Sequence, residues 1–294
     1  MEPTARKDRP VLDLHMHTTV SDGTDTPEII LSRVREAEIA LFSVTDHDAF
    51  KGCQVIRPLL TPEGPRFLPG VEFSCKDEEG KYHILGYGFD PETEGIRSVV
   101  KAGHRLRMKK VTARLDFLKD RFGFSFPQEE IDGLLALDNP GKPHIGNLMV
   151  KYGYVSTKEE AIKDYIDQLH FQSAYVRPED AIAGILASGG VPVLAHPTYG
   201  SGDQLILGED MDRRLRRLMD YGLAGVEAFY SGFTDRIRRE VLDFAARYDL
   251  YVTAGSDYHG ANKLVELKDT GLAEAAEWPR GLLRFLETVQ DRIW

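Results

Sequence analysis

The sequence predicts an α/β fold built on a mainly parallel sheet or barrel, and two observations support this prediction. Short apolar stretches alternate with segments of helical periodicity along much of the 294-residue chain. Histidines and acids recur at or just beyond the ends of these stretches, which in α/β barrels is the rim where active sites form. A chain of this length can hold one large barrel or two average domains, and either buries a sizeable core.

The expected strands and helices follow in order along the chain. The first strand is expected at VLDLHMH, and the helix after it should begin at Thr26-Pro27, because Thr26 suits the N-cap and Pro27 the first turn. Ile29, Ile30, Val34 and Ala37 would form its apolar side. Further strands are expected at LFSVTDHD, RFLPGVEF, KYHILGYGF, GVPVLAH, LAGVEAFYS and LYVTAGSD, most of them followed by helical pattern.

One long segment interrupts this alternation. Between about residues 95 and 180 the sequence shows no convincing strand but several helical stretches, namely IRSVVKAGHRLRMKKVTARLDFLKDRF, EEIDGLLAL, KEEAIKDYIDQL and PEDAIAGILAS. We therefore expect residues 96–180 to form a helical insertion, or lid, over the active site. Residues 1–95 and 181–294 would form the metal-binding barrel.

Composition and charge exclude several classes of protein. The chain is 42% hydrophobic and has no apolar run near 18 residues, so no membrane-spanning segment is expected. The polar start MEPTARKDRP lacks a secretory signal, and two cysteines, Cys53 and Cys75, fit packing in a reducing cytoplasm. The net charge of −10 argues against a long nucleic-acid track, which needs a cationic surface. No protein partner is inferred.

Nine side chains at the predicted strand ends are candidate metal ligands. Side chains two apart in a strand face the same way, so His15 and His17 can reach one point above the rim. An isolated His-x-His pair is more often part of a polar loop, but the other strand ends add enough ligands for two or three clustered divalent ions. The full set is His15, His17, Asp22, His47, Glu72, His83, His196, Asp257 and His259.

Two other interpretations of these side chains compete with a cluster of metal ions. A structural zinc site would favour cysteine ligands, and neither cysteine has the required spacing. Some of the histidines, His83 above all, could instead be satisfied core residues. Asp13, Asp46 and Asp48 are expected to orient the histidine ligands, with capping of the next helix as an alternative for Asp46.

The motifs HMHTTVSDG, TDHD, GVEF, KYHILGYG, AHP and GSDYHG occur in the order and approximate spacing of the PHP (polymerase and histidinol phosphatase) superfamily. The match runs from about residue 11 to 263, and the insertion segment GKPHIGNLMVKYGYVSTKEEAI is most similar to the nucleotide-bisphosphatase branch. The resemblance implies a distorted (β/α)7 barrel with a helical insertion. It also implies three sites for Mn²⁺, Fe²⁺ or Zn²⁺: His15, His17, Glu72 and Asp257; Glu72, His83 and His196; and Asp22, His47 and His259.

A basic segment indicates which bond this centre would hydrolyse. Residues 97–121 carry nine Lys or Arg against two Asp, a net +7 within an acidic chain. A solvated helix face is the simpler explanation, but a lid position favours contact with a phosphate. The candidate substrate contacts are Arg105, Arg107, Lys142, His144, Arg177, Tyr230 and Lys263. His144 is also the one candidate acid for the leaving group, with capping of the helix after Pro143 as its alternative.

The expected activity is therefore metal-dependent hydrolysis of a phosphate ester. A metal-bridging hydroxide would attack phosphorus, so no protein nucleophile is needed. The preferred substrate is a small phosphomonoester such as a nucleoside 3′,5′-bisphosphate. The alternatives are a cyclic phosphodiester of a phosphorylated sugar, histidinol phosphate, and short RNA trimmed from its 5′ end. A non-catalytic anion or metal sensor would require lost ligands, and none is missing from the set.

Overall fold

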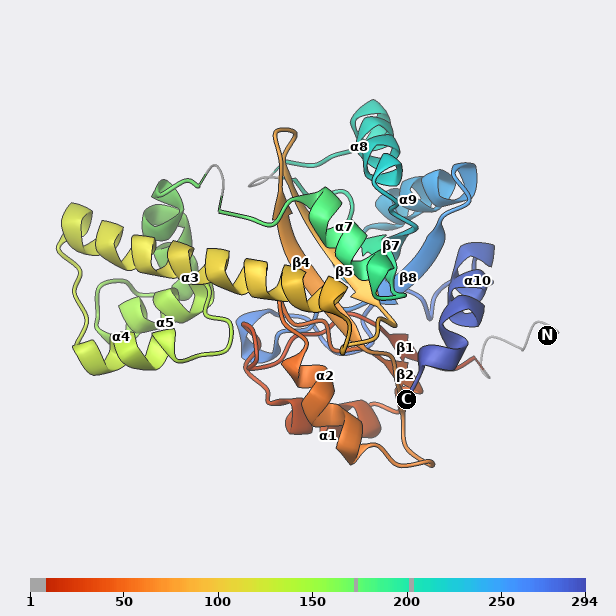
Figure 1. Cartoon of the computed structure of the whole chain (residues 1–294), viewed down its shortest axis with the longest axis horizontal. Coiled ribbons are helices and arrows are strands. Elements are labelled where there is room, and N and C mark those ends of the chain that lie inside the picture. Colours follow the sequence, from red (N-terminus) through yellow and green to blue (C-terminus); the bar gives the residue numbers. More distant parts are fainter. Residues whose placement is uncertain (1–8, 172–173, 201–203) are drawn as a thin grey trace.

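The computed structural model describes residues 9–171, 174–200 and 204–294, and it contains a mixed α/β fold with two sheets. The smaller sheet has three parallel strands, β1 (Leu12–Asp13), β2 (Leu41–Phe42) and β3 (Arg66–Phe67). The larger sheet has the order β4 (Gly70–Lys76), β5 (Lys81–Tyr87), β6 (Val191–Leu194), β7 (Gly225–Tyr230) and β8 (Tyr251–Gly255). The strands cluster in one body of the molecule (Figure 1).

The larger sheet is only partly parallel, which differs from the expectation. β5 runs antiparallel to both β4 and β6, whereas β6, β7 and β8 are parallel. The physical reason is the four-residue turn 77–80, which is too short for a crossover. The carboxylate of Asp77 closes this turn by accepting hydrogen bonds from the backbone N–H groups of Glu79 and Gly80. The segment 70–87 is therefore a hairpin rather than two strands linked by a helix.

Hydrogen bonds join the two sheets along two seams. Leu14, just after β1, donates its backbone N–H to the carbonyl of Ala254 in β8 at 2.9 Å. On the other side, Asp48 donates its backbone N–H to the carbonyl of Glu72 in β4 at 2.9 Å. Both seams lie beside residues of the predicted metal centre.

Helices cover the sheets from outside. Pro27 opens the first helix and Thr26 caps it by accepting from the backbone of Ile29, as predicted. α7 packs on β5 and β6, α9 on β7, and α10 on β8 (Figure 1). Cys53 and Cys75 are both free and buried in the core, again as predicted. The bounds are α1 (Pro27–Glu36), α2 (Lys51–Ile56), α7 (Pro178–Ala187), α8 (Gly208–Asp220), α9 (Asp235–Arg247) and α10 (Arg280–Val289).

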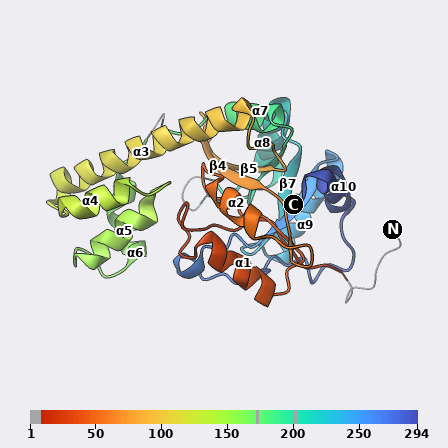
Figure 2. The same ribbon diagram turned by 60° about the horizontal axis from the view of Figure 1, so that its bottom comes forward.

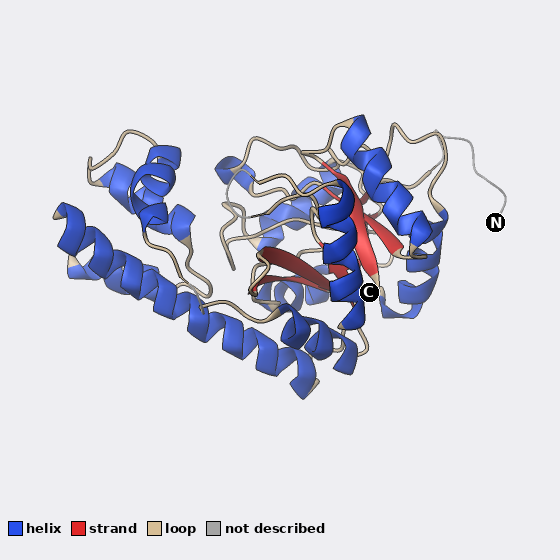
Figure 3. Cartoon of the chain, turned by 90° about the horizontal axis from the view of Figure 1, so that it is seen from above, coloured by secondary structure: helices blue, strands red, loops and turns tan. Residues whose placement is uncertain are grey.

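A helical segment projects from this body. Its spine is α3 (Glu94–Phe122), whose first half packs against α7 and β4 and whose second half extends away (Figure 2). The second half joins α4 (Gln128–Leu135), α5 (Lys142–Lys151) and the residues after α6 (Lys158–Glu160) around a hydrophobic cluster separate from the main core. Figure 3 shows only helices and loops in this projection. Throughout the described ranges, every helix is too short or too polar to cross a bilayer.

Candidate metal centre

The first ligands reach the centre because β1 and β8 keep pairing beyond their ends. The backbone N–H of Asp257 donates to the carbonyl of His15 at 2.8 Å, and that of His17 donates to the carbonyl of Tyr258 at 2.8 Å. This pairing places the Asp257 carboxylate 3.5 Å from His15 Nε2 and 3.4 Å from His17 Nε2. Sequence-distant strand ends thus meet at one point, as the barrel-rim argument predicts.

The carboxylate of Glu72 lies at the middle of the cluster and is 1% exposed. Two histidine nitrogens approach its Oε2 and three approach its Oε1. The distances are 3.1 Å from His47 Nδ1, 3.2 Å from His17 Nε2, 2.9 Å from His83 Nδ1, 3.2 Å from His196 Nε2 and 3.4 Å from His15 Nε2. One carboxylate therefore faces five of the six predicted imidazole ligands.

Two of these ligands do not come from strand ends. Glu72 is the third residue of β4 and His83 the third residue of β5, so the expectation that all nine follow strand C-termini is wrong for them. The antiparallel hairpin explains His83, because the start of β5 lies beside the end of β4, and Glu72 differs because β4 continues to Lys76. Both side chains still reach the same edge of the sheet.

Asp22 gathers a second group of ligands. Its Oδ1 lies 3.3 Å from His259 Nε2 and 3.9 Å from a nitrogen of both His17 and His47. All nine predicted ligands thus lie in one cluster. Ligand atoms within 4.8 Å of one another form three groups: His17, Asp22, His47 and His259; His15, His17 and Asp257; and His47, Glu72 and His83.

The donor atoms fit metal ions better than they fit one another. His15 Nε2 and His17 Nε2 face each other at 3.2 Å. Asp22 Oδ1, His47 Nδ1 and His83 Nδ1 are buried without a hydrogen-bond partner, although both imidazole nitrogens lie about 3 Å from the carboxylate of Glu72. Unsatisfied lone pairs rarely converge in a buried site unless a cation binds there. Nitrogen and oxygen donors alone suit Mn²⁺, Fe²⁺ or Zn²⁺.

The pKa shifts of Glu72 and His17 indicate that positive charge is stabilised at these two side chains. Burial alone would raise the pKa of Glu72, but His83 and His15 beside it hold that pKa well below its ordinary range. Burial lowers the pKa of His17, yet hydrogen bonds to Asp257 and Glu72 raise it to about 9. Protons and divalent ions compete for the same electron pairs, so the centre is built to hold cations.

Sequence reasoning missed one important residue, Glu227. Its side chain is fully buried in β7, with Oε1 2.8 Å from His15 Nδ1 and Oε2 accepting from the backbone N–H of His196 at 2.9 Å. It therefore orients one ligand ring and the loop that carries another. The available signal was an acid inside the apolar strand GVEAFY, since a buried carboxylate requires partners.

The three aspartates expected to orient histidine rings do not contact any ring directly. Asp46 accepts from the backbone N–H of Thr18 and from the hydroxyl of Ser21, each at 2.8 Å. Ser21 Oγ in turn lies 3.3 Å from His17 Nδ1, so Asp46 acts through a hydroxyl. Asp13 accepts from the backbone N–H groups of His15, Ser256 and Lys268.

Backbone strain is concentrated at this centre. Of the six described non-glycine residues with positive φ, three belong to it: Asp48 at 49°, His196 at 26° and Asp257 at 57°. Such conformations persist only where surrounding contacts impose them, and they gather at functional sites.

Helix α3 brings Arg107 to the edge of the centre. Its Nε and Nη2 donate to Asp48 Oδ2 at 3.1 and 2.7 Å, and Nη2 also donates to Ser74 Oγ at 3.1 Å. Asp48 thus binds an arginine instead of orienting a histidine. Arg105 lies two residues earlier on α3 and is exposed, because helical residues two apart face different directions. The structure separates these two candidates.

Lys142 and His144 begin α5 near the centre, but both have structural partners. His144 Nδ1 accepts from the backbone N–H of Gly141 at 3.0 Å, which is the capping role weighed as its alternative. Burial lowers the pKa of His144, and the opposing influence of Asp22 shows how close the centre is. Because Nδ1 accepts, the neutral ring carries its proton on Nε2. Lys142 pairs with Asp167.

The remaining candidates divide between the centre and the surface. Tyr230 donates its hydroxyl to Asp257 Oδ2 at 3.0 Å, and Lys263 Nζ contacts both Tyr230 and Asp257. Arg177 instead pairs with Glu78 and Glu179 and is 41% exposed. The structure therefore brings Tyr230 and Lys263, but not Arg177, to the predicted ligand Asp257.

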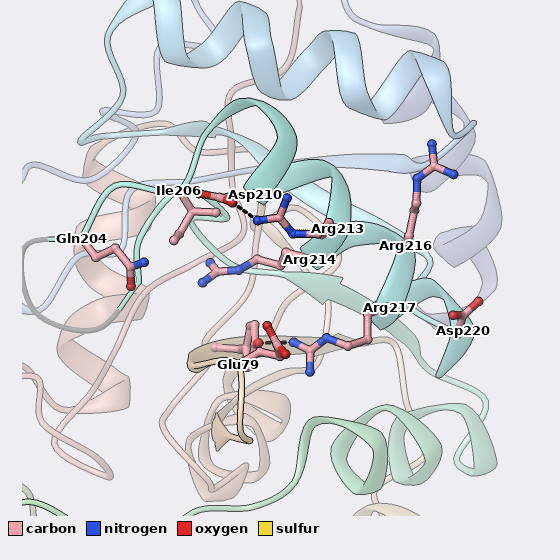
Figure 4. Close-up of a pocket in the computed structure, with 10 residues that line it drawn as sticks. Glu79, Gln204, Ile206, Asp210, Arg213, Arg214, Arg216, Arg217 and Asp220 are labelled. Carbon is pink, nitrogen blue, oxygen red and sulfur yellow. Dashed lines mark hydrogen bonds and ion pairs between the residues drawn. The ribbon is translucent and has the colours of Figure 1, made fainter.

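A cavity of about 570 Å³ lies elsewhere, beside α8 (Figure 4). Four arginines line it, and each has a partner: Arg213 pairs with Asp210, Arg216 with Asp212, Arg217 with Asp77, and Arg214 donates to the carbonyls of Pro197 and Tyr199. None of the nine predicted ligands lines it. Arg213 and Arg216 thus pair within α8, whereas Arg214 and Arg217 tie α8 to the 197–199 loop and to Asp77.

Curated relatives resemble the chain over most of its length. A 5′-3′ exoribonuclease, Rnm, of Salmonella typhimurium is 28% identical over 87% of this chain and 88% of its own. A phosphoribosyl 1,2-cyclic phosphate 1,2-diphosphodiesterase of Eggerthella lenta is 29% identical over 84% and 94%. A 3′,5′-nucleoside bisphosphate phosphatase of Chromobacterium violaceum is 29% identical over 84% and 87%.

Solved structures and a family match agree with the fold. A structure from Bifidobacterium adolescentis, assigned as a metal-dependent phosphoesterase, has a TM-score of 0.76 and 26% identity over 98% of both chains. An amidohydrolase structure from Chromobacterium violaceum has a TM-score of 0.79 and 24% identity over 97% of both chains, which shows the fold alone. Residues 13–176, more than half of the chain, match the family described as PHP domain. The chain therefore belongs to the PHP domain family.

Proposed function

We propose that this protein is a metal-dependent phosphoesterase that acts on a small phosphorylated metabolite, preferably a nucleoside 3′,5′-bisphosphate. The observation that carries the proposal is the convergence of eight potential ligands in three groups, joined by His196 through Glu72, beside the buried guanidinium of Arg107. Metals beside an arginine suit an anionic substrate more than a neutral amide. The three curated relatives are all named for cleaving phosphate esters.

Two or three divalent ions would occupy the cluster. Following the family resemblance, we assign them to His15, His17, Glu72 and Asp257; to Glu72, His83 and His196; and to Asp22, His47 and His259. The central position of Glu72 supports its role as the shared ligand. The geometry favours one addition, since His47 Nδ1 also faces Glu72. Bound ions would lower the pKa of water and stabilise charge on the phosphoryl oxygens.

The chain itself would bind and orient the substrate. The guanidinium of Arg107 has N–H groups left over after Asp48 and Ser74, and we assign them to a phosphate oxygen. Lys263 Nζ and the Tyr230 hydroxyl hold the outer oxygen of Asp257. His144 presents a neutral Nε2–H, which makes it our candidate donor to the leaving oxygen. Arg105, Lys142 and Arg177 remain weaker candidates because they are exposed or already paired.

The architecture we propose is a distorted (β/α)7 barrel covered by a lid of residues 96–180. The seams at Leu14–Ala254 and Asp48–Glu72 support the barrel, and the separate hydrophobic cluster supports the lid. Lys158 of α6 donates to the carbonyl of Asn262, whose side chain donates to the carbonyl of Asp22. The lid is thereby tied to a loop that carries a metal ligand.

Metal analysis and a substrate panel test the proposal. Purified protein should contain at least two Mn, Fe or Zn per chain and release phosphate from a bisphosphate faster than from a cyclic phosphate, histidinol phosphate or short 5′-phosphorylated RNA. His17→Ala should abolish turnover while the circular dichroism spectrum stays unchanged. Preference for the RNA would favour the exoribonuclease alternative, and metal-loaded protein that hydrolyses none of these esters would refute the proposal.

A further inference from the structure

The cavity beside α8 lies behind two of the predicted metal ligands. Tyr82 forms part of its wall and precedes His83 on β5, and successive side chains of a strand point to opposite faces of the sheet. Arg214 of α8 forms another part, and its Nη1 donates to two backbone carbonyls of the loop 197–199 at 2.9 and 2.8 Å. This loop follows His196 directly. The cavity is therefore separate from the metal centre but shares its supports.

The cavity has the size of a small-molecule site. Its volume of about 570 Å³ falls within the range of roughly 300–1,000 Å³ that is typical of ligand pockets. In Figure 4 the side chain of Arg214 extends into the space between Ile206 and Glu79. A cationic group thus faces a space that is large enough for a metabolite.

Arg214 carries a buried charge that no acid neutralises. It is 6% exposed, and within the described ranges it forms no ion pair, whereas each of the other three arginines that line the cavity pairs with an aspartate. In the same ranges its hydrogen bonds run only from Nη1 to carbonyl oxygens, so Nε and Nη2 have no acceptor. Burial lowers the pKa of Arg214 below its ordinary value, because its neighbours do not fully compensate for the loss of water.

The inner part of the cavity is aromatic and cationic. The guanidinium carbons of Arg214 and Arg217 lie 4.9 and 5.3 Å from the ring centroid of Tyr82, which is itself buried. The three acids that line the cavity are all exposed: Glu79, Asp210 and Asp220. A ligand that reaches the ring therefore meets the buried guanidinium of Arg214, whereas the carboxylates remain near solvent.

We propose that this cavity binds a small anionic metabolite through Arg214, at a site distinct from the metal centre. Nε and Nη2 form one edge of the guanidinium, and two parallel N–H groups on such an edge match the two oxygens of a phosphate or carboxylate group. Nη1 of the same guanidinium holds the loop 197–199. A bound anion would fix this guanidinium and thereby the loop beside His196, so the ligand would act as an effector rather than as a substrate.

Calorimetric titration of the purified protein with phosphate and with succinate tests the site. At least one probe should bind with a dissociation constant of about 1 mM or below. Arg214→Gln should weaken this binding roughly tenfold or more, because the charged donor pair is lost. Phosphate that binds at the metal centre persists in this variant, so the difference between the two proteins reports the cavity. Arg213→Gln, an exposed arginine of the same cavity, is the matched control and should behave as wild type.

A second variant blocks the cavity without changing Arg214. Gln204 lines the cavity and is exposed, so Gln204→Trp should leave the fold intact and weaken binding by filling the space. This variant decides the question if Arg214→Gln does not fold. Absence of binding for both probes, or wild-type affinity in every folded one of the two variants, would overturn the site. The probe that binds more tightly distinguishes a phosphate-bearing from a carboxylate-bearing ligand.

Hydrogen exchange tests the effect on the loop beside His196. The tighter probe should slow exchange of the backbone amides in the segment 196–199 of the wild type, and it should do so less in Gln204→Trp at the same probe concentration. The end of α3, at residues 115–122, serves as the internal reference and should be unchanged. Bound probe with unaltered exchange in the segment 196–199 would overturn the effector role.

Discussion

Replacing Glu227 by glutamine tests whether a residue beneath the ligands sets their affinity for metal. Both carboxylate oxygens are in use, one at 2.8 Å from His15 Nδ1 and the other accepting from the backbone N–H of His196. For His15 Nε2 to bind a metal, Nδ1 must carry the proton and donate. Glutamine has one acceptor oxygen, so one of the two buried donors must face an NH₂ group.

The expected loss follows from this geometry. An unsatisfied buried donor costs about 1–3 kcal/mol. Mutation of a carboxylate that orients a metal-bound histidine lowers metal affinity by roughly 10–100-fold, or about 1.4–2.8 kcal/mol. The two estimates overlap, so Glu227→Gln should bind Mn²⁺ at least tenfold more weakly than wild type.

Competition with a fluorescent chelator would measure this affinity. Glu209→Gln, at an exposed position on α8, is the matched control and should match wild type. Urea unfolding of the metal-free variant would show that the fold is retained. A dissociation constant within twofold of wild type, with the fold intact, would refute the assigned role of Glu227.

Three further predictions concern the lid and the loops. Arg107→Met leaves the Asp48 carboxylate buried without its cation, so the free energy of unfolding should fall by about 3 kcal/mol in urea titrations. KM for a bisphosphate should also rise. If neither the stability nor KM changes, the assigned contact between Arg107 and Asp48 is contradicted. Asp46→Ala removes the carboxylate that accepts hydrogen bonds from Thr18 and Ser21, so the free energy of unfolding should fall by about 1–3 kcal/mol and metal binding should weaken. Unchanged metal affinity would argue against the action of Asp46 through Ser21. The third concerns Lys110, whose folded pKa of about 7 lies below its ordinary value of 10.5. Between these values the unfolded chain binds the extra proton, so the stability of metal-free protein should gain up to about 1.4 kcal/mol per pH unit as the pH rises, and Lys110→Met should lose this gain. Equal pH slopes in urea titrations of the two proteins would show that Lys110 is not desolvated.

The ligand cluster could be predicted from sequence because metal chemistry restricts residue type. Burying histidines and acids beside apolar strands costs free energy unless they are paired or bind a common ion. Nine such side chains in one chain therefore predict a metal site. His83 could also be interpreted as a satisfied core residue. In the structure its Nδ1 lies 2.9 Å from Glu72 Oε1, and its side chain is one-third exposed. The strand-end rule failed for Glu72 because β4 continues to Lys76, beyond the expected end at Phe73, and for His83 because β5 runs antiparallel and brings its first residues to the centre.

The contacts of residues that lie behind the predicted ligands could not be predicted in this way. Glu227 looks like any acid within a strand until its neighbours His15 and His196 are placed in space. On α3, no local sequence feature separates Arg105 from Arg107, because the helix packs first on the main core and then on the separate hydrophobic cluster of the helical projection. Only the packed structure decides which arginine faces Asp48.

Removal and return of metal tests the central claim most directly. Protein stripped with a chelator should release no phosphate from adenosine 3′,5′-bisphosphate, and added Mn²⁺ should restore release with at least two ions bound per chain. Glu72→Gln, which alters the carboxylate that faces five histidines, should bind fewer ions and stay inactive when Mn²⁺ is returned. Full activity in the stripped wild type, or in Glu72→Gln, would contradict the account.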